Sequence, residues 1–376
     1  MLRQFILSTW VITTAALAQP QLSPAPSDVP TIANYDVEEL AEGFNQPWGL
    51  SFLPGGAMLV AERSGTIQLV SKDGKNRVAL EGVPEAFVKS QAGFFEALPH
   101  PNFAANQWVY LSYAWGSNDE NGLRVARAKL VGNALTDLEI LFTVSPLKSG
   151  GAHYGGRMTF LPDGTLVFGT GEGYNYREHS QQLNSLMGKI IRINADGSIP
   201  ADNPFVGRDD ARAEIWSYGH RNPQGIVFDT NTNVLYVHEH GPKGGDEINV
   251  IEAALNYGWP AITYGTEYSG AQITPYTELD GMEQPMFYYV PSIAPAGFAQ
   301  LQNSQFSAWD GDFLIAALAG KEVRHVDMEN GQVVGQHRLL TEREARFRDV
   351  RQGPDGAIYV LTDSSEGSIL RLTPAQ

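Results

Sequence analysis

The sequence predicts an all-β protein, a six-bladed β-propeller, on two observations. The first is composition: 39 glycines and 22 prolines divide short apolar runs, and amphipathic helical patterns are scarce. The second is repetition: LSFLPGGAMLVAER, MTFLPDGTLVFGTGEG and VRQGPDGAIYVLTDSS share an apolar pair, a Pro-Asp-Gly-like turn and an alternating strand. Repeats of about 40–50 residues are typical of propellers, and this chain length suits about six of them. A β-sandwich, the alternative, gives no reason for one unit to recur.

The first 18 residues are expected to be a secretory signal peptide and not part of the fold. Arg3 gives a positive start, residues 5–17 are mostly apolar, and Ala16-Leu17-Ala18 fits an A-x-A cleavage sequence. The mature chain would then begin at Gln19, and a periplasmic location is expected. An uncleaved anchor is the alternative. No other segment approaches the roughly 20 apolar residues that a membrane-spanning helix needs.

Residues 19–32, rich in proline, serine and alanine, predict a flexible leader, and residues 33–376 a single propeller domain. The chain contains no cysteine, which excludes disulfides and thiolate metal sites. The formal net charge of −16 argues against nucleic acid as a partner, because phosphates require a basic surface.

The stretch from residue 214 to 260 holds the densest group of polar and glycine-rich motifs. Apolar runs at 225–228 and 234–237 flank a turn that contains Asp229, and this pattern predicts a β-hairpin. Charged and polar residues crowd both ends of the hairpin. Loops at the ends of a sheet are where binding groups usually lie, so this stretch is a candidate ligand site.

Two kinds of metal site are possible after this hairpin. His238 and His240 would share one face of a strand, but no matching cysteine or histidine pair completes a zinc set. Glu247, Asp246 and the carbonyls of Gly241-Pro242 are hard oxygen ligands of the kind calcium takes from loops. A solvated acidic turn is the alternative to calcium.

Elsewhere, His153 is the best catalytic candidate. It lies among glycines ahead of a strand, where a substrate could approach closely, and imidazole suits a general base; a structural histidine is the alternative. Arg346 and Arg348 share a strand face and suit a carboxylate-rich ligand, with surface solvation as the alternative. The chain has no nucleophile elbow and no Walker loop, and Gly-Thr-Gly-Glu-Gly at 169–173 lacks the helix of a dinucleotide site.

Taken together, the motifs resemble a known family. They are NQPWGLSFLPGG, HPNF, HYGGR, LNSLMGKIIRIN, EIWSYGHRNPQG, EHGPKGGDEIN, NYGWP and RFRDVRQGPDG. From about Gln46 to Leu372 the chain resembles the soluble, pyrroloquinoline quinone (PQQ)-dependent aldose sugar dehydrogenases, the soluble glucose dehydrogenase family. The resemblance implies a six-bladed propeller with PQQ over the channel mouth beside a calcium ion. It also implies oxidation of an aldose and transfer of the electrons to a quinone or a small redox protein.

The resemblance also implies roles for single residues. His153 matches the general base that takes the proton from the anomeric hydroxyl while hydride passes to the quinone. Gly241 and Pro242 match the carbonyls that hold the cofactor calcium, and Glu247 and Tyr257 match a second, structural calcium site. Paired arginines and a cation suit PQQ because it carries three carboxylates. The PQQ-binding positions of the family fall at Gln91, Arg221, Asn222, Arg346 and Arg348.

Two departures from the family pattern affect the expected site. The lysine that contacts PQQ in the glucose dehydrogenase falls at Ala319 here, and Lys321, two residues on, is the candidate to replace it. Ala152 replaces the acid that precedes the base. Two other functions stay open: a calcium-dependent lactonase on a propeller, using Glu247 or Asp246, and a non-catalytic propeller that binds carbohydrate or protein. If His153 is not the base, His220 is next.

Overall fold

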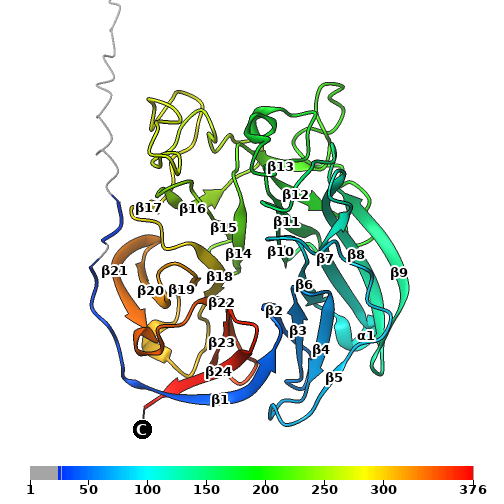
Figure 1. Cartoon of the computed structure of the whole chain (residues 1–376), viewed down its shortest axis with the longest axis vertical. Helices are drawn as coiled ribbons and strands as arrows, with labels where there is room; N and C mark the ends of the chain where they lie inside the picture. Colours follow the sequence, from blue (N-terminus) through cyan, green and yellow to red (C-terminus); the bar gives the residue numbers. More distant parts are fainter. Residues whose placement is uncertain (1–23, 27, 376) are drawn as a thin grey trace, which may run out of the picture.

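The computed structural model describes residues 24–26 and 28–375. They form six four-stranded antiparallel sheets arranged as a ring around a central channel (Figure 1). The predicted six-bladed propeller is confirmed, and the sandwich alternative is wrong. The predicted signal peptide, residues 1–18, and the predicted mature start at Gln19 lie outside the described residues, so the division of the chain into signal, leader and domain stays a prediction.

Each blade is a meander, and its first strand is the innermost. In chain order the six blades are β2 (Pro47–Phe52), β3 (Met58–Glu62), β4 (Thr66–Val70), β5 (Arg77–Ala79); β6 (Phe94–Pro99), β7 (Trp108–Gly116), β8 (Asn121–Val131), β9 (Ala134–Thr143); β10 (Gly155–Phe160), β11 (Leu166–Thr170), β12 (Lys189–Ile193), β13 (Ile215–Tyr218); β14 (Pro223–Asp229), β15 (Val234–Glu239), β16 (Asp246–Ile251), β17 (Phe287–Tyr289); β18 (Pro295–Gln300), β19 (Phe313–Ala317), β20 (Glu322–Glu329), β21 (Gln332–Leu339); and β22 (Phe347–Gln352), β23 (Ile358–Thr362), β24 (Gly367–Pro374), β1 (Tyr35–Phe44). The helical segments of the described chain are short: α1 (Phe103–Asn106) and the 3₁₀ turns η1 (Arg177–Gln181), η2 (Ser307–Trp309) and η3 (Thr341–Arg343).

The ring closes through the sixth blade, which takes strands from both ends of the domain. β1 is its outermost strand and pairs antiparallel with β24, so that Tyr35 lies opposite Pro374 and Phe44 opposite Gly367. In Figure 1 the blue β1 lies beside the red β24. Joining the two ends in one sheet leaves no gap in the ring.

The repeated turn motif builds each blade in the same way. Gly164 adopts φ +83° in the turn between β10 and β11, a conformation that favours glycine. The carboxylate of Asp163 accepts hydrogen bonds from the backbone N–H and the hydroxyl of Thr165 at 2.9 and 2.7 Å. Apolar side chains then fill the spaces between blades; one cluster joins Leu59 of β3 to Phe94 of β6.

Every innermost strand carries a β-bulge at its beginning, the end that faces one mouth of the channel. The register shifts between Pro47 and Gly49 in β2, and between Pro223 and Gly225 in β14; β6, β10, β18 and β22 shift at the same place. A bulge re-aims side chains and is common beside binding sites. Six aligned bulges therefore mark this mouth as the place where side chains turn inward.

The described part of the predicted leader lies against the protein. The backbone N–H of Ala25 donates to the carbonyl of Tyr288 at 2.7 Å, and that of Ile32 to Arg338 at 2.9 Å. Ala25 and Val29 are buried. Across the described residues, no helix has the length and apolar character needed to cross a membrane.

Candidate functional site

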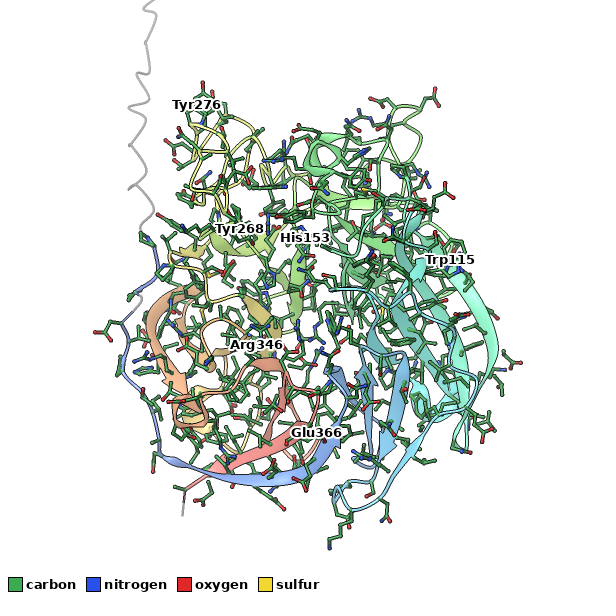
Figure 2. All side chains as sticks on the ribbon, in the orientation of Figure 1. Trp115, His153, Tyr268, Tyr276, Arg346 and Glu366 are labelled. Atoms are coloured by element: carbon green, nitrogen blue, oxygen red, sulfur yellow. The ribbon has the colours of Figure 1, made fainter. Side chains whose placement is uncertain are left out.

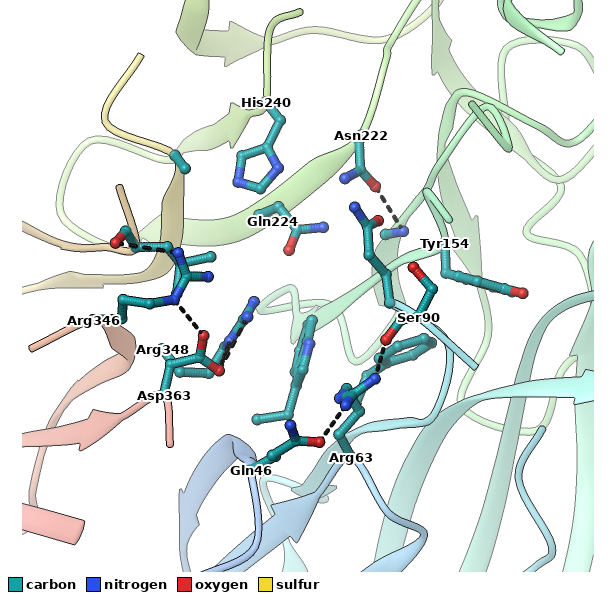
Figure 3. Close-up of a pocket in the computed structure, with 16 residues that line it drawn as sticks. Gln46, Arg63, Ser90, Tyr154, Asn222, Gln224, His240, Arg346, Arg348 and Asp363 are labelled. Carbon is teal, nitrogen blue, oxygen red and sulfur yellow. Dashed lines mark hydrogen bonds and ion pairs between the residues drawn. The ribbon is translucent and has the colours of Figure 1, made fainter. Parts of the chain in front are cut away.

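A cavity of about 420 Å³ lies at the mouth marked by the bulges (Figure 3). All six blades contribute to its lining through the innermost strand or the residue just before it. These residues are Trp48, Phe95, Gly155, Gln224, Ala294 and Arg348. A volume of this size is ordinary for a small-molecule or cofactor site.

The rest of the lining follows the blade repeat. In most blades the residue after the second strand donates its backbone N–H to the carbonyl of the residue before the innermost strand, and both side chains then face the cavity. Asp363 and Arg346 form one such pair, at 2.7 Å. The others that line the cavity are Arg63 with Gln46, His240 with Asn222, and Leu318 with Ala294.

The cavity is cationic although the chain as a whole is anionic. Its charged lining consists of Arg63, Arg346, Arg348 and a single carboxylate, Asp363. Arg346 Nε lies 2.9 Å from Asp363 Oδ2, and Arg348 Nη2 lies 3.2 Å from Oδ1. Burial opposes ionisation of Asp363, but the charges of Arg348 and Arg346 outweigh it and hold its pKa below the usual range. One aspartate thus neutralises the arginine pair only in part.

Arg63 is the third cation of the lining, and it comes from the first blade. It donates to the carbonyl of Ser90 and to the side-chain oxygen of Gln46, which fixes its guanidinium at the rim. Burial and the positive charge of Arg221 hold the pKa of His240 well below its usual value, so this histidine is neutral. The excess positive charge of the cavity therefore comes from arginine.

A buried ionic network closes the channel beneath the cavity. Arg157 Nη1 lies 3.0 Å from Asp349 Oδ2 and 3.4 Å from Glu96 Oε1, and Arg351 binds the same two carboxylates. Arg157 also donates to the carbonyls of Trp48 and Arg348 at 3.1 and 3.3 Å. Two arginines balance two acids, so the network fixes the backbone under the cavity without adding net charge.

His153 lies beside the cavity, at the start of the third blade. The residue is 3% exposed, its φ is +51°, and its backbone N–H donates to Gln91 Oε1 at 3.0 Å. Its Nδ1 lies 2.9 Å from Glu172 Oε1. Gly171 makes this pairing possible, because a Cβ there would lie 2.4 Å from the carbonyl of His153. Figure 2 places His153 and Arg346 near the centre of the ring.

The protonation state of His153 follows from these contacts. Burial lowers its pKa most, the hydrogen bond to Glu172 raises it, and the charge of Arg221 lowers it again; the net shift is downward. The neutral ring donates Nδ1–H to Glu172, which leaves the lone pair on Nε2. No hydrogen-bond partner of Nε2 occurs within the described part of the chain. This nitrogen is available to accept a proton.

Some of the other predicted PQQ contacts line the cavity, and others do not. Gln91, Asn222, Arg346 and Arg348 line the cavity, and Asn222 Oδ1 accepts from the backbone of Gly155 at 3.1 Å. Ala319 and Lys321 are exposed and do not line it; Leu318, their neighbour, does. Lys321 thus does not stand in the cavity as a replacement for the family lysine.

A second, smaller void of about 10 Å³ lies under the loop after β15. Glu239 and Glu247 are directly opposite each other on β15 and β16, and both line this void with Tyr257. Burial first, and then the charge of Glu239, raise the pKa of Glu247 to about 8. Like charges directly opposite on two strands destabilise a sheet, so the void suits a cation, and its volume suits a single ion.

Arg221 and Gly241 also line this void and contact each other. Arg221 Nη1 donates to the carbonyl of Gly241 at 2.6 Å and to that of His240 at 3.0 Å. The Nε of Arg221 is buried and has no hydrogen-bond partner among the described residues. Pro242 is buried and lines neither cavity.

The remaining histidines of the hairpin stretch have structural contacts. His238 Nε2 is 3.4 Å from the carbonyl of Gly297, and His240 Nε2 is 2.7 Å from that of Pro295. Burial lowers the pKa of His238 to about 3. The metal-ligand cluster found among the described residues lies elsewhere, in the fifth blade, and includes neither histidine.

Several residues of the site were not predicted from the sequence. Glu172 lies in the Gly-Thr-Gly-Glu-Gly run, whose glycines suggest only a dinucleotide loop, and Glu239 precedes His240 in the stretch with the candidate metal ligands. Arg63 and Asp363 follow the second strands of repeat units that were recognised, so their equivalent positions were the signal that could have found them. Nothing local marks Arg157 as part of a buried network.

Comparisons with known proteins agree with this geometry. The family model described as glucose/sorbosone dehydrogenase matches residues 44–371. The aldose sugar dehydrogenase YliI of Escherichia coli is 39% identical over 348 residues, which cover 91% of this chain and 94% of that protein. Quinoprotein glucose dehydrogenase B of Acinetobacter calcoaceticus is 29% identical, over 94% of this chain and 91% of that one.

Two solved structures are also similar. The apo-form of the soluble aldose sugar dehydrogenase of Escherichia coli has a TM-score of 0.87 at 39% identity and covers 90% of this chain and 99% of that one. The PQQ-bound aldose sugar dehydrogenase of Streptomyces coelicolor has a TM-score of 0.73 at 28% identity, covering 91% and 99%.

Proposed function

Because the chain belongs to the glucose/sorbosone dehydrogenase family, we propose that it is a PQQ-dependent aldose sugar dehydrogenase that oxidises the anomeric hydroxyl to a lactone. The observation that carries the proposal is the cavity, which presents three arginines and one carboxylate on a chain of net charge −16. Such a cavity selects a small polyanion, because each arginine can pair with a carboxylate.

The lining fits PQQ, a flat tricarboxylate. Arg346, Arg348 and Arg63 would bind its carboxylates, Gln91 and Asn222 would bind its polar edge, and Trp48 supplies an aromatic surface. When bound, PQQ supplies the quinone carbon that accepts the hydride. The buried network of Arg157 holds the backbone of Trp48 and Arg348, and so keeps the floor rigid.

His153 acts as the general base in this proposal. Its Nε2 takes the proton of the anomeric hydroxyl, while Nδ1–H keeps donating to Glu172, which holds the ring in this tautomer and stabilises the positive charge that develops. His220 is unsuited to the role because Ser217 and Glu239 bind both of its ring nitrogens.

Calcium completes the proposed site. Glu247, Glu239 and the backbone oxygen of Tyr257 would hold a structural ion in the small void. Gly241 and Pro242 would hold the cofactor calcium; the Gly241 carbonyl accepts a hydrogen bond from Arg221 and keeps a second lone pair for the ion.

The proposal includes export to the periplasm after removal of residues 1–18, with electrons passed to a quinone or a small redox protein. N-terminal sequencing of the periplasmic protein is expected to begin at Gln19. An intact Met1 on exported protein would contradict this part.

Reconstitution tests the function directly. The purified protein is loaded with PQQ and Ca²⁺, and reduction of an artificial dye is measured with a panel of aldoses. We expect dye reduction that requires PQQ, Ca²⁺ and sugar together. Hydrolysis of a lactone with Ca²⁺ alone would instead indicate a lactonase, and sugar binding without turnover a binding propeller.

A further inference from the structure

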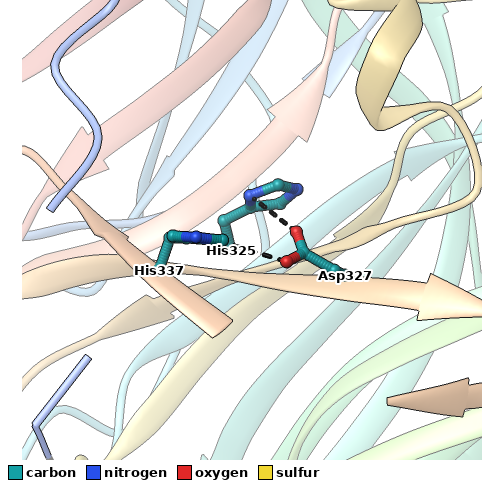
Figure 4. Close-up of side chains that lie close together, drawn as sticks. All are labelled: His325, Asp327 and His337. Carbon is teal, nitrogen blue, oxygen red and sulfur yellow. Dashed lines mark ion pairs between the residues drawn. The ribbon is translucent and has the colours of Figure 1, made fainter. Parts of the chain in front are cut away.

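Three potential metal ligands share one face of the outer strands of the fifth blade. His325 and Asp327 are two residues apart on β20, so both side chains point the same way, and His337 of β21 is directly opposite His325. Figure 4 shows the carboxylate of Asp327 facing both imidazoles, with an ion pair drawn to each. None of these residues lines the cavity of the proposed active site.

The distances are those of a metal site. Nδ1 of His325 lies 3.3 Å from one carboxylate oxygen of Asp327, and Nδ1 of His337 lies 3.2 Å from the other. One ligand atom from each residue falls within 4.8 Å of the others. Zinc–nitrogen and zinc–oxygen bonds of about 2.0–2.1 Å in a tetrahedron place neighbouring ligand atoms about 3.3 Å apart.

Both nitrogens lack a hydrogen bond. Nδ1 of His325 and Nδ1 of His337 are buried, and neither has a hydrogen-bond partner within the described residues, although each faces a carboxylate. The side chain of His325 is 1% exposed. Buried polar atoms are nearly always satisfied, so two unsatisfied nitrogens aimed at one carboxylate call for an explanation.

A second carboxylate sets the tautomer of His325. Its Nε2 lies 2.8 Å from Asp312 Oδ2, and the other oxygen of Asp312 accepts from the backbone N–H of Met328 at 2.8 Å. Asp312 is thus held in place as an acceptor, and His325 donates Nε2–H to it. The lone pair of Nδ1 then faces Asp327, the carboxylate–histidine–metal arrangement of many metal proteins.

The backbone leaves room for this arrangement. A Cβ at Gly335, opposite Asp327 on β21, would lie 2.3 Å from Asp327 Oδ2. Any other residue there would push the carboxylate away from the two imidazoles. On the other side, the ring of Trp309 packs against His325 with centroids 4.4 Å apart.

We propose that His325, Asp327 and His337 bind one divalent transition-metal ion, with Zn²⁺ as the ion that the ligands fit. Two imidazole nitrogens and one carboxylate oxygen suit Zn²⁺, whereas calcium takes six to eight oxygens. The side chains of Asp327 and His337 are 26% and 28% exposed, so water can occupy a fourth position. The ion cross-links β20 and β21.

Metal titration in the presence of calcium tests this proposal, independently of the dehydrogenase activity. The protein is stripped with chelator, saturated with Ca²⁺ and titrated with Zn²⁺ by calorimetry; Co²⁺ is added in parallel as a spectroscopic probe. We expect one Zn²⁺ per chain that excess Ca²⁺ does not displace, and visible absorption of Co²⁺ with tetrahedral intensity. Absence of both signals in the natural protein overturns the proposal.

Variants locate the ion. His337→Gln, at a partly exposed position, is expected to weaken Zn²⁺ binding by at least about 100-fold, and Asp312→Asn, which removes an outer hydrogen-bond partner, by about 10–100-fold. His100→Gln is the matched control, because His100 lies in another blade and binds the backbone of Asn102. A Zn²⁺ isotherm of His337→Gln that is the same as that of the natural protein would contradict the assignment.

Discussion

Two neighbouring blades carry the same histidine–glutamate pair, and only one of the pairs is suited to catalysis. His153 with Glu172 in the third blade and His220 with Glu239 in the fourth have the same Nδ1–Oε1 distance, 2.9 Å, and the same spacing of 19 residues. The propeller repeat has therefore placed one arrangement twice.

The two pairs differ at the other ring nitrogen. Nε2 of His220 binds Ser217 Oγ at 2.9 Å, and its ring stacks on Tyr257 with centroids 4.7 Å apart. Nε2 of His153 has no hydrogen-bond partner in the described chain, and the 46% exposed Tyr174 packs edge-on against its ring. The hydrogen-bond partner of Nε2 therefore decides whether such an acid–histidine pair can act as a base or only stabilises the structure.

The largest effect should separate the two histidines. Replacing His153 by Gln removes the proton acceptor, and general base catalysis is worth about 10²–10⁴-fold, so the kcat of the PQQ-loaded enzyme should fall by at least about 100-fold. His220→Gln should keep kcat within a few-fold. Steady-state dye reduction measures kcat for both variants. Near-normal turnover by His153→Gln would show that the two histidine–glutamate pairs do not differ in catalytic role.

Glu172, the acid of the pair in the third blade, should affect the pH dependence of the activity. As the proposed base, His153 works in its neutral form, and its lowered pKa places the acidic limb of the kcat/KM profile below about pH 6.5, the ordinary histidine value. Glu172→Gln removes an interaction that raises this pKa, so the limb should move to still lower pH, and kcat should fall because the ring is no longer held in its working tautomer. An unmoved limb would mean that Glu172 does not act on His153.

Cofactor binding should respond to different residues from those that set turnover. Arg348→Ala removes a charge-assisted contact worth about 1.5–3 kcal/mol, so PQQ should bind about 10–100-fold more weakly, with most of kcat recovered at saturating PQQ. Arg371→Ala is the control, since Arg371 of β24 pairs with Asp355 in the turn between β22 and β23, at 2.8 Å. Equal loss of PQQ affinity in both variants would point to a general fold defect.

Calcium should stabilise the fourth blade, and the pH dependence of stability should show the part that Glu247 plays. The folded pKa of Glu247 is raised from 4.5 to about 8, so the metal-free protein takes up a proton on folding, and stability present below about pH 4.5 is lost as the pH rises toward 8. Calcium at 100 times its Kd adds roughly 2.7 kcal/mol, on the order of 4 °C in Tm. Thermal melts with EDTA or Ca²⁺ across this range test this; curves that coincide would mean that the void holds no ion.

The smallest effect is the cost of the structural pair. His220→Gln loses one or both buried hydrogen bonds, and an unsatisfied buried group costs about 1–3 kcal/mol. Urea denaturation should show this loss with little change in kcat at permissive temperature. A variant as stable as the natural protein would show that the second pair does not stabilise the structure.

The sequence predicted the fold because the information was local and repeated: a turn such as Pro162-Asp163-Gly164 specifies its own hairpin. It predicted His153, Arg346 and Arg348 because each belongs to a distinctive motif. It missed Glu172, which follows the second strand of the blade whose first strand His153 precedes. Neither residue lies in a motif that names the other, so their contact becomes visible only once the two strands are paired in the blade.

Ring closure by β1 has a consequence for protein synthesis. Tyr35 cannot pair until Pro374 has been made, and at about 5–20 residues per second the ribosome needs on the order of tens of seconds for the intervening chain. Throughout this delay β1 is an unpaired edge that could join a neighbouring nascent chain. Its sequence, YDVEELAEGF, carries four acidic residues, and charged side chains on an unpaired edge disfavour the pairing of that strand with copies of itself.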